Sequence, residues 1–339
     1  MKFWKKGLAL CLALVMTLSL AACGGDESTE EQPPEESVQV RVAALKGPTA
    51  MGMVKMMSDS DAAAESGETA SGNTYAFQLA ASGDEVSPLL LQGELDIACL
   101  PANMASILYN RTEGGIVTLA VNTLGVLYLV ENGNAVQSIE DLRGKTIVAS
   151  GKDSTPEYAL RYLLTENGID PDTDVTIDWK SEHSECVAAL ASGAATIAML
   201  PQPFVTVAQN QLSDLRIALD LTEEWDALDN GSALLTGVVV ARADFVKEHP
   251  TAVSDFLEQY SASVEWVNAN TAEAAELIGS YDIVEAAVAE QALPYCNIVC
   301  ITGTEMMDML SGYLSVLWEQ NPESVGGAMP NDDFYYGAA

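Results

Sequence analysis

The sequence contains the same short pattern twice. Leu90–Pro101 reads LLQGELDIACLP and Leu190–Pro201 reads LASGAATIAMLP. The two copies share a leucine, a glycine, an isoleucine–alanine pair, a second leucine and the final proline at matching positions. Each copy predicts a helix ended by a glycine, a short buried strand, and a proline that opens the next helix. A repeated unit of this kind predicts two similar halves of an α/β fold.

A second, weaker similarity lies upstream of each copy. Each half has a strand, a polar loop and a helix there, and in the loops Lys46 matches Lys152 and Thr49 matches Thr155. The predicted strands are Val40–Ala44 and Thr146–Ala149, and the predicted helices are Ala50–Met57 and Pro156–Thr165. Each half therefore reads β-α-β-α-β and is expected to form a mostly parallel sheet covered by helices.

The remaining sequence is interpreted as connections and a C-terminal helical part. The 339 residues exceed the range in which one hydrophobic core keeps growing, which favours two lobes. The polar stretch Ser58–Asn73 is predicted to be a surface loop, and Ala233–Ala241 a strand. Only helices are expected after that strand: Thr251–Asn268, Ala272–Ser280, Val284–Leu293 and Glu305–Glu319. Because helices alone cannot complete a third βαβ half, this part must return to one of the first two.

The N-terminus has the pattern of a secretory signal. Three lysines precede the uncharged apolar run Gly7–Leu20, which has the length of a signal core and is short for a membrane span. The following LAACGG resembles a bacterial lipobox with Cys23 as the lipidated residue. We expect a signal peptide at residues 1–22, a disordered tether at residues 23–37, and anchoring through acyl chains such as palmitate. A plain secretory signal with an incidental cysteine is the alternative.

The charge balance excludes one class of partner. The chain has 15 basic and 49 acidic residues, and its formal net charge is −34. Binding to nucleic acid needs a basic face that neutralises phosphates, so nucleic acid is not an expected partner. The acidity is better explained by solubility in an extracellular setting.

The cysteines outside the signal and the anchor are interpreted as structural. Cys99, Cys186, Cys296 and Cys300 are predicted to be buried free thiols. A disulfide between Cys296 and Cys300 would require a turn, because an extended segment holds them too far apart. No Cys-x-x-Cys spacing typical of zinc or redox sites occurs in the sequence.

The sequence has few residues of the kind that carry catalysis. Its two histidines, His183 and His249, have no companions at metal-ligand spacing. The sequence contains no Gly-x-Ser-x-Gly elbow, P-loop or dinucleotide-binding glycine motif. His249 is predicted to be exposed beside a helix start, and His183 to be either a pocket or a surface residue. We therefore expect no catalytic residue, no metal and no cofactor.

Four predicted helix starts follow parallel strands. The first N–H groups of a helix have no partner within the helix and carry positive potential, and ligands of open α/β sheets bind at this edge. If the two halves face one another, these starts converge on one cleft, where hydroxyls, amides and two lysines are available. The candidate ligand-binding residues are Lys46, Pro48, Thr49, Asn103, Lys152, Ser154, Thr155 and Gln202, together with His183. Ordinary capping by Thr49, Ser154 and Thr155 is the alternative explanation.

Several longer segments resemble one family of transport proteins. LKGPTAMGMVKMM at Leu45–Met57, SIEDLRGKTIVASG at Ser138–Gly151, the repeats, Ala243–Asn270 and Asn321–Tyr336 carry the resemblance. The chain is similar over residues 38–336 to ABC-transporter solute-binding lipoproteins of the nitrate/sulfonate/taurine and thiamine-pyrimidine-synthase-like group.

The resemblance implies the type II periplasmic-binding-protein fold, an α/β architecture of two lobes with mixed, mostly parallel sheets and a C-terminal helical extension. Two crossover segments are expected, near Asn122-Thr123 and near Gly231-Ser232. Residues 38–122 and 232–339 then form lobe 1, and residues 123–231 form lobe 2.

The resemblance also implies a function. The chain would close over a small anionic or zwitterionic solute, such as a sulfonate, nitrate or taurine, and deliver it to an ABC permease and its ATPase. It would be an extracytoplasmic monomer attached to the membrane through Cys23, and not an enzyme.

Alternatives remain open at this point. A heterocycle binder is the first alternative, although the loop Leu45–Thr49 lacks the tryptophans of thiamine-pyrimidine binders. Pyrimidine-synthase relatives share the fold and use an active-site histidine, for which His183 is the candidate. A sensor or adhesion lipoprotein that kept the fold without transport is the third alternative.

Overall fold

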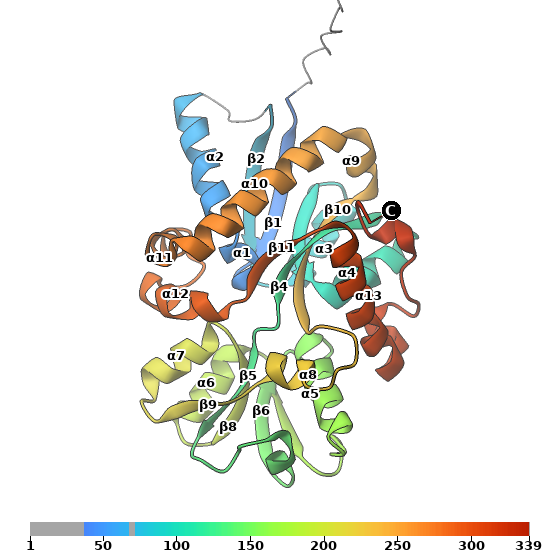
Figure 1. Ribbon diagram of the computed structural model, residues 1–339. Helices are drawn as coiled ribbons and strands as arrows, with labels where there is room; N and C mark the ends of the chain where they lie inside the picture. Colours follow the sequence, from blue (N-terminus) through green and yellow to red (C-terminus); the bar gives the residue numbers. More distant parts are fainter. Residues whose placement is uncertain (1–36, 68–71, 339) are drawn as a thin grey trace, which may run out of the picture. The chain divides into compact units, whose positions relative to one another are not determined.

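The fold contains two β-sheets (Figure 1). The computed structural model describes residues 37–67 and 72–338. The predicted signal peptide, Cys23 and the tether up to residue 36 lie outside the described residues. Sheet A is six-stranded, with the order β11-β4-β10-β3-β1-β2, and sheet B is five-stranded, with the order β7-β6-β8-β5-β9. The strands of sheet A are β1 Gln39–Leu45, β2 Thr74–Ala80, β3 Ile97–Pro101, β4 Ile116–Leu124, β10 Leu235–Arg242 and β11 Ile298–Ile301. Those of sheet B are β5 Leu127–Asn132, β6 Thr146–Ser150, β7 Thr176–Lys180, β8 Ile197–Pro201 and β9 Leu215–Asp220.

Helices connect the strands and cover the sheets. Before β10 the helices are α1 Pro48–Met51, α2 Val54–Ser66, α3 Gly83–Leu91, α4 Ala102–Arg111, η1 Ile139–Leu142, α5 Thr155–Glu166, α6 His183–Ala191, α7 Phe204–Gln211 and α8 Leu221–Asp226. After β10 they are α9 Ala243–Glu248, α10 Pro250–Ala269, α11 Thr271–Ser280, α12 Ala286–Ala292, η2 Leu293–Tyr295, α13 Gly303–Gln320, η3 Pro322–Val325 and η4 Asp332–Phe334. This mixed α/β architecture agrees with the predicted fold class. Among the described residues, no helix combines the length and the apolar character that a membrane span requires.

The duplicated pattern forms the same local structure in both sheets. In each copy a helix (α3 or α6) is followed by a left-handed glycine, Gly93 with φ 75° and Gly193 with φ 72°, and then by a buried strand. A left-handed residue after the helix is a position that glycine occupies without steric cost. The strand then pairs in parallel with the first strand of its half, β3 with β1 and β8 with β6.

The C-terminal part of the chain joins sheet A. Strand β10 lies between β3 and β4 and is antiparallel to both, and β11 is antiparallel to β4 at the edge. Helix α10 packs on α2, where the Ser263 hydroxyl donates to the Gly52 carbonyl at 2.7 Å and accepts from the Met56 N–H at 3.2 Å. In Figure 1, α10 lies across this sheet and α13 beside α4.

The chain passes from one sheet to the other in two short segments. Strand β4 ends at Leu124 and β5 begins at Leu127, and the return runs from α8 to β10 over residues 227–234. A Cβ at Gly125 would lie 2.1 Å from the Thr222 hydroxyl oxygen, so this position has no room for a side chain. The division into lobes at residues 122–123 and 231–232 stays a prediction.

Four local predictions were wrong. The expected helix Ala50–Met57 is interrupted between α1 and α2, at Gly52 and Met53. The stretch predicted as the loop Ser58–Asn73 contains the rest of α2, which is largely exposed and follows helix propensity in its alanine run rather than apolar periodicity. Strand β11 lies within the part expected to be only helical. The helix after Pro201 begins at Phe204.

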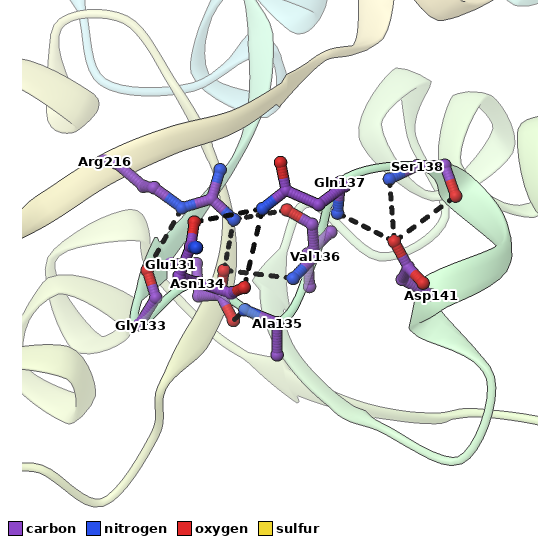
Figure 2. A network of polar contacts seen from close by, with 9 residues as sticks. All are labelled: Glu131, Gly133, Asn134, Ala135, Val136, Gln137, Ser138, Asp141 and Arg216. Atoms are coloured by element: carbon purple, nitrogen blue, oxygen red, sulfur yellow. Dashed lines mark hydrogen bonds and ion pairs between the residues drawn. The ribbon is translucent and has the colours of Figure 1, made fainter.

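A polar network fastens the loop after β5 to sheet B (Figure 2). The buried Glu131 carboxylate accepts from the Ala135 N–H at 2.9 Å, the Val136 N–H at 3.2 Å and the Arg216 guanidinium at 2.5 Å. Burial would raise the pKa of Glu131, but these hydrogen bonds outweigh it and lower the pKa. The network joins β5, its following loop and β9 into one unit.

Candidate functional site

The ends of the parallel strands of both sheets lie close to the crossing between them. In sheet A, Pro101 at the end of β3 pairs with Gly237, which in turn pairs with Thr123 near the end of β4. In sheet B, Pro201 at the end of β8 pairs with Leu127, the first residue of β5. Because only two residues separate β4 from β5, the carboxyl edges of the two sheets meet at this crossing. This is the edge at which open α/β sheets bind ligands.

Thr49 marks the sheet A side of this edge. The Thr49 side chain is buried, and its hydroxyl donates to the Leu45 carbonyl at 2.8 Å. A Cβ at Gly237 would lie 2.7 Å from Thr49 Cγ2 and 2.5 Å from Asn122 Oδ1, so the glycine permits this close packing. Pro48 opens α1, which has only four residues, and Lys46 is exposed.

Asn103 lies in the first turn of α4, directly after β3. Its side chain is buried, and its amide nitrogen donates to the Ser324 carbonyl at 3.3 Å. The C-terminal segment thus reaches the start of α4.

His183 lies on the sheet B side, at the start of α6. The Ser150 hydroxyl, at the end of β6, hydrogen-bonds His183 Nδ1, and the Phe204 ring lies 5.0 Å from the imidazole between centroids. Burial lowers the pKa of His183 to about 4, so the imidazole is neutral near pH 7. It can therefore exchange hydrogen bonds there but contributes no positive charge.

The remaining candidates on this side belong to two helix starts. The Ser154 hydroxyl donates to the Gly151 carbonyl at 2.7 Å, while Thr155 is buried at the first position of α5. Lys152 is exposed. Gln202 is buried, and its side-chain oxygen accepts from the Thr206 hydroxyl at 2.9 Å, so it is tied to the first turn of α7.

The candidates fall into two groups. Those of sheet A and those of sheet B each lie at one carboxyl edge, and no hydrogen bond or ring contact joins a candidate of one group to one of the other within residues 37–67 and 72–338. His249, predicted to be exposed, is half-buried because its ring packs on Phe245. The predicted burial of all four cysteines was wrong at one position, since Cys300 is partly exposed; all four are free thiols.

Buried polar atoms without a partner gather around the same edge. Such atoms are costly unless water or a ligand binds them. Among the described residues eight side chains have such an atom. Thr118 lies away from the crossing, whereas the phenol of Tyr260, in α10, reaches Asn122 near the end of β4. The other six come from the end of β4, from the starts of α4, α5, α8 and β10, and from α13: Asn103, Asn122, Thr155, Thr222, Thr236 and Tyr313.

Four of these six residues are absent from the sequence-based candidates. Asn122 ends an apolar strand and could have been found by that position, as could Thr236. Tyr313 lies in the middle of α13, where its pattern is that of a core residue. Its phenol lies close to the Thr155 hydroxyl, a proximity that no local pattern predicts.

Two cavities lie near this edge, and the first reaches the crossing at Leu124. One of about 360 Å³ is lined by Leu124, Asn268, Thr271, Pro294, Asn297 and others, all uncharged. The other, of about 580 Å³, lies between α5 and the end of α13 and includes Asp153, Glu157, Arg161 and Asp172. None of the nine candidate residues lines either cavity. In the part of the chain that is described, no group of three His, Cys, Asp or Glu side chains is placed to hold a metal ion.

A family model described as "ABC transporter, phosphonate, periplasmic substrate-binding protein" matches residues 63–292, more than half of the chain. Among curated protein sequences, none matches.

Solved structures share the fold. An ABC transporter protein from Parabacteroides distasonis is 22% identical, with a TM-score of 0.73 over 87% of this chain and 98% of that one. The periplasmic aliphatic sulphonate binding protein SsuA from Escherichia coli is 16% identical, with a TM-score of 0.69 over 85% and 90%. The alkanesulfonate-binding protein SsuA from Xanthomonas axonopodis pv. citri, bound to MOPS, is 14% identical, with a TM-score of 0.63 over 88% and 96%.

Proposed function

Because the chain belongs to the family of periplasmic phosphonate substrate-binding proteins of ABC transporters, we propose that it captures a small solute between its two sheets and delivers it to an ABC permease. Proteins of this family bind small solutes outside the cytoplasm and work with permease components. They are transport proteins rather than enzymes, and we extend this to the present chain.

The observation that carries the proposal is the meeting of two carboxyl edges at one crossing. Both edges present helix starts whose N–H groups favour acceptor atoms. The unpartnered buried polar atoms gather at the same place, which supports a position for solute or water atoms. Closure of the two lobes over the solute would be selected because only the closed form makes contacts from both sides.

We infer that the solute is a small oxyanion or zwitterion. The starts of α4 and α5 favour negative oxygen atoms, and Thr49, Ser154 and Thr155 add hydroxyls. His183 supports this as a neutral hydrogen-bonding group. Lys46 and Lys152 are the exposed cations beside these loops and would pair with the solute or stay in solvent. Pro48, Asn103 and Gln202 complete the proposed site.

We also propose a lipid anchor at Cys23 on a monomeric protein. The support is the lipobox-like sequence after the apolar run. Replacement Cys23→Ala is expected to release the protein from membranes into the medium or periplasm. Retention of the variant in the membrane fraction would contradict the anchor.

A ligand screen tests the solute-binding function. Binding to the folded form alone stabilises the protein by RT ln(1 + [L]/Kd), about 2.7 kcal/mol at a hundredfold excess over Kd. We expect phosphonates, sulfonates, nitrate or taurine to raise the unfolding temperature of the protein without its signal peptide. A thiamine pyrimidine in the same screen tests the heterocycle alternative.

Matched threonine variants locate the site. Thr155→Val removes the buried hydroxyl at the start of α5, whereas Thr165→Val removes an exposed hydroxyl near the end of the same helix. Weakened binding in Thr155→Val alone is expected. Equal binding by both variants would remove α5 from the site, and the absence of any stabilising solute would refute the function.

A further inference from the structure

We propose that the carbonyl oxygen of Asn103 determines solute specificity, because it requires a group that donates a hydrogen. This inference rests on the proposed solute-binding function and adds a chemical requirement to it. The preferred solute is then an oxyanion that also carries its own O–H or N–H donor.

The position of Asn103 directs its side chain toward the site. It lies in the first turn of the ten-residue helix α4, after the carboxyl end of β3. Side chains of a helix point toward its N-terminus, which here is the edge where the sheets meet. Asn103 is 3% exposed, so its polar atoms need partners other than bulk solvent.

The C-terminal segment determines which amide atom is free. The Asn103 nitrogen donates to the Ser324 carbonyl, and a carbonyl can only accept, so the nitrogen must face Ser324. Ser324 is itself held, since its hydroxyl donates to the Leu317 carbonyl at 3.1 Å. Ser106 and Asn110, further along α4, each donate to the Val325 carbonyl at 2.8 Å.

The oxygen of Asn103 is left without a partner by this arrangement. No donor reaches Oδ1 from residues 37–67 or 72–338. Thr155 and Tyr313 also carry buried hydroxyls, and these two lie close to one another. Tyr313 lies one helical turn before Leu317, whose carbonyl accepts from Ser324. Helix α13 therefore links Ser324, the partner of Asn103, to Thr155 at the start of α5.

Solutes differ in whether they can meet this demand. A sulfonate has three acceptor oxygens and no donor, so it satisfies helix N–H groups but leaves Asn103 Oδ1 unpaired. A phosphonate monoanion has similar shape and carries one P–O–H, and an ammonium group on either compound also donates. Leaving a buried acceptor unpaired is expected to weaken binding about 5- to 150-fold.

Calorimetry with two matched pairs tests the inference. The pairs are ethylphosphonate with ethanesulfonate, and 2-aminoethylphosphonate with 2-aminoethanesulfonate. If P–O–H is the donor, the phosphonate binds more tightly in both pairs, and ethylphosphonate weakens as pH rises through its second ionisation while ethanesulfonate does not. If the ammonium is the donor, each amino compound binds more tightly than its parent. Equal binding of all four overturns the inference while leaving solute capture intact, whereas binding of none overturns both.

Two variants separate specificity from structure. Asn103→Leu removes the acceptor and the contact to Ser324, and is expected to abolish the preference for the donor-bearing solute. Asn110→Leu is the control, because it also loses contacts to the C-terminal segment but lies two turns further along α4. It should keep the preference. Persistence of the preference in Asn103→Leu overturns the inference; should that variant not fold, the pH series on the unaltered protein decides.

Discussion

Replacing Glu131 by glutamine is expected to destabilise the unit built on sheet B. The Glu131 side chain is 4% exposed and accepts three hydrogen bonds, from two backbone N–H groups and from Arg216. Glutamine keeps one acceptor oxygen but turns an N–H₂ group toward a donor, and it removes the charge opposite the guanidinium. Hydrogen bonds to charged groups contribute about 1.5–3 kcal/mol each. Because Arg216 is 29% exposed and the pair is partly screened, we expect a loss of about 2–4 kcal/mol in the free energy of unfolding.

The pH dependence of that loss is a sharper test than its size. The pKa of Glu131 is lowered in the folded protein, so the carboxylate stabilises the fold above the ordinary value of 4.5. This contribution disappears as the pH falls through the folded-state pKa. Chemical unfolding of both proteins should therefore show a large difference at pH 7 that shrinks below pH 4.5.

A control in the same loop separates this effect from a general loss of charge. Asp141 also accepts backbone hydrogen bonds, from Gln137 at 2.8 Å and Ser138 at 3.0 Å (Figure 2), but it is less buried than Glu131 and has no arginine partner among the described residues. Asp141→Asn should destabilise less than Glu131→Gln. Stability of Glu131→Gln equal to that of the unaltered protein at pH 7, or a deficit that persists unchanged at pH 3.5, would refute the reasoning.

Three further changes have defined outcomes. Tyr128→Phe removes the hydrogen bond from β5 to the Tyr295 carbonyl, 3.1 Å long, and should cost about 1 kcal/mol in thermal unfolding; no change would show that the contact contributes nothing. The lowered pKa of His183, about 4, means that stability present above pH 6.5 is lost as the pH falls toward 4, by at most about 1.4 kcal/mol per pH unit. His183→Gln should flatten that slope, and an unchanged slope would contradict burial of a neutral imidazole. A thiol reagent should modify Cys300 before Cys296 in the folded protein, because burial is incomplete at Cys300; simultaneous modification would contradict the packing.

Local chemistry made the repeated units predictable. Gly93 and Gly193 occupy left-handed positions after a helix, and the apolar runs that follow them form buried strands in both sheets. These features depend on a few neighbouring residues, so they can be seen in the sequence without knowledge of the fold.

The missed elements depend on distant contacts or lack a distinctive pattern. Strand β11 has four residues, which is too short for periodicity to separate it from a helix, and it is a strand because β4 pairs with it. The second part of α2 has little apolar surface to reveal its period.

The candidate site divides in the same way. Thr49 and Thr155 could be proposed from the sequence because they lie at the starts of helices that follow strands. Tyr313 was missed because α13 brings it to Thr155 from far along the chain. The free atom of Asn103 is likewise determined by Ser324, so sequence could identify the residue but not its hydrogen-bonding demand.

The place of β10 in sheet A separates the order of synthesis from the order of folding. This strand lies between β3 and β4 and is the element that joins them. Ribosomes and secretion machinery both present the chain from its N-terminus, so β3 and β4 emerge long before the strand that must hold them together. All strands of sheet B, by contrast, lie within residues 127–220 and precede β10. Sheet B can thus reach its native structure before sheet A. The part of sheet A that is made first stays incomplete until residues 235–242 insert between β3 and β4.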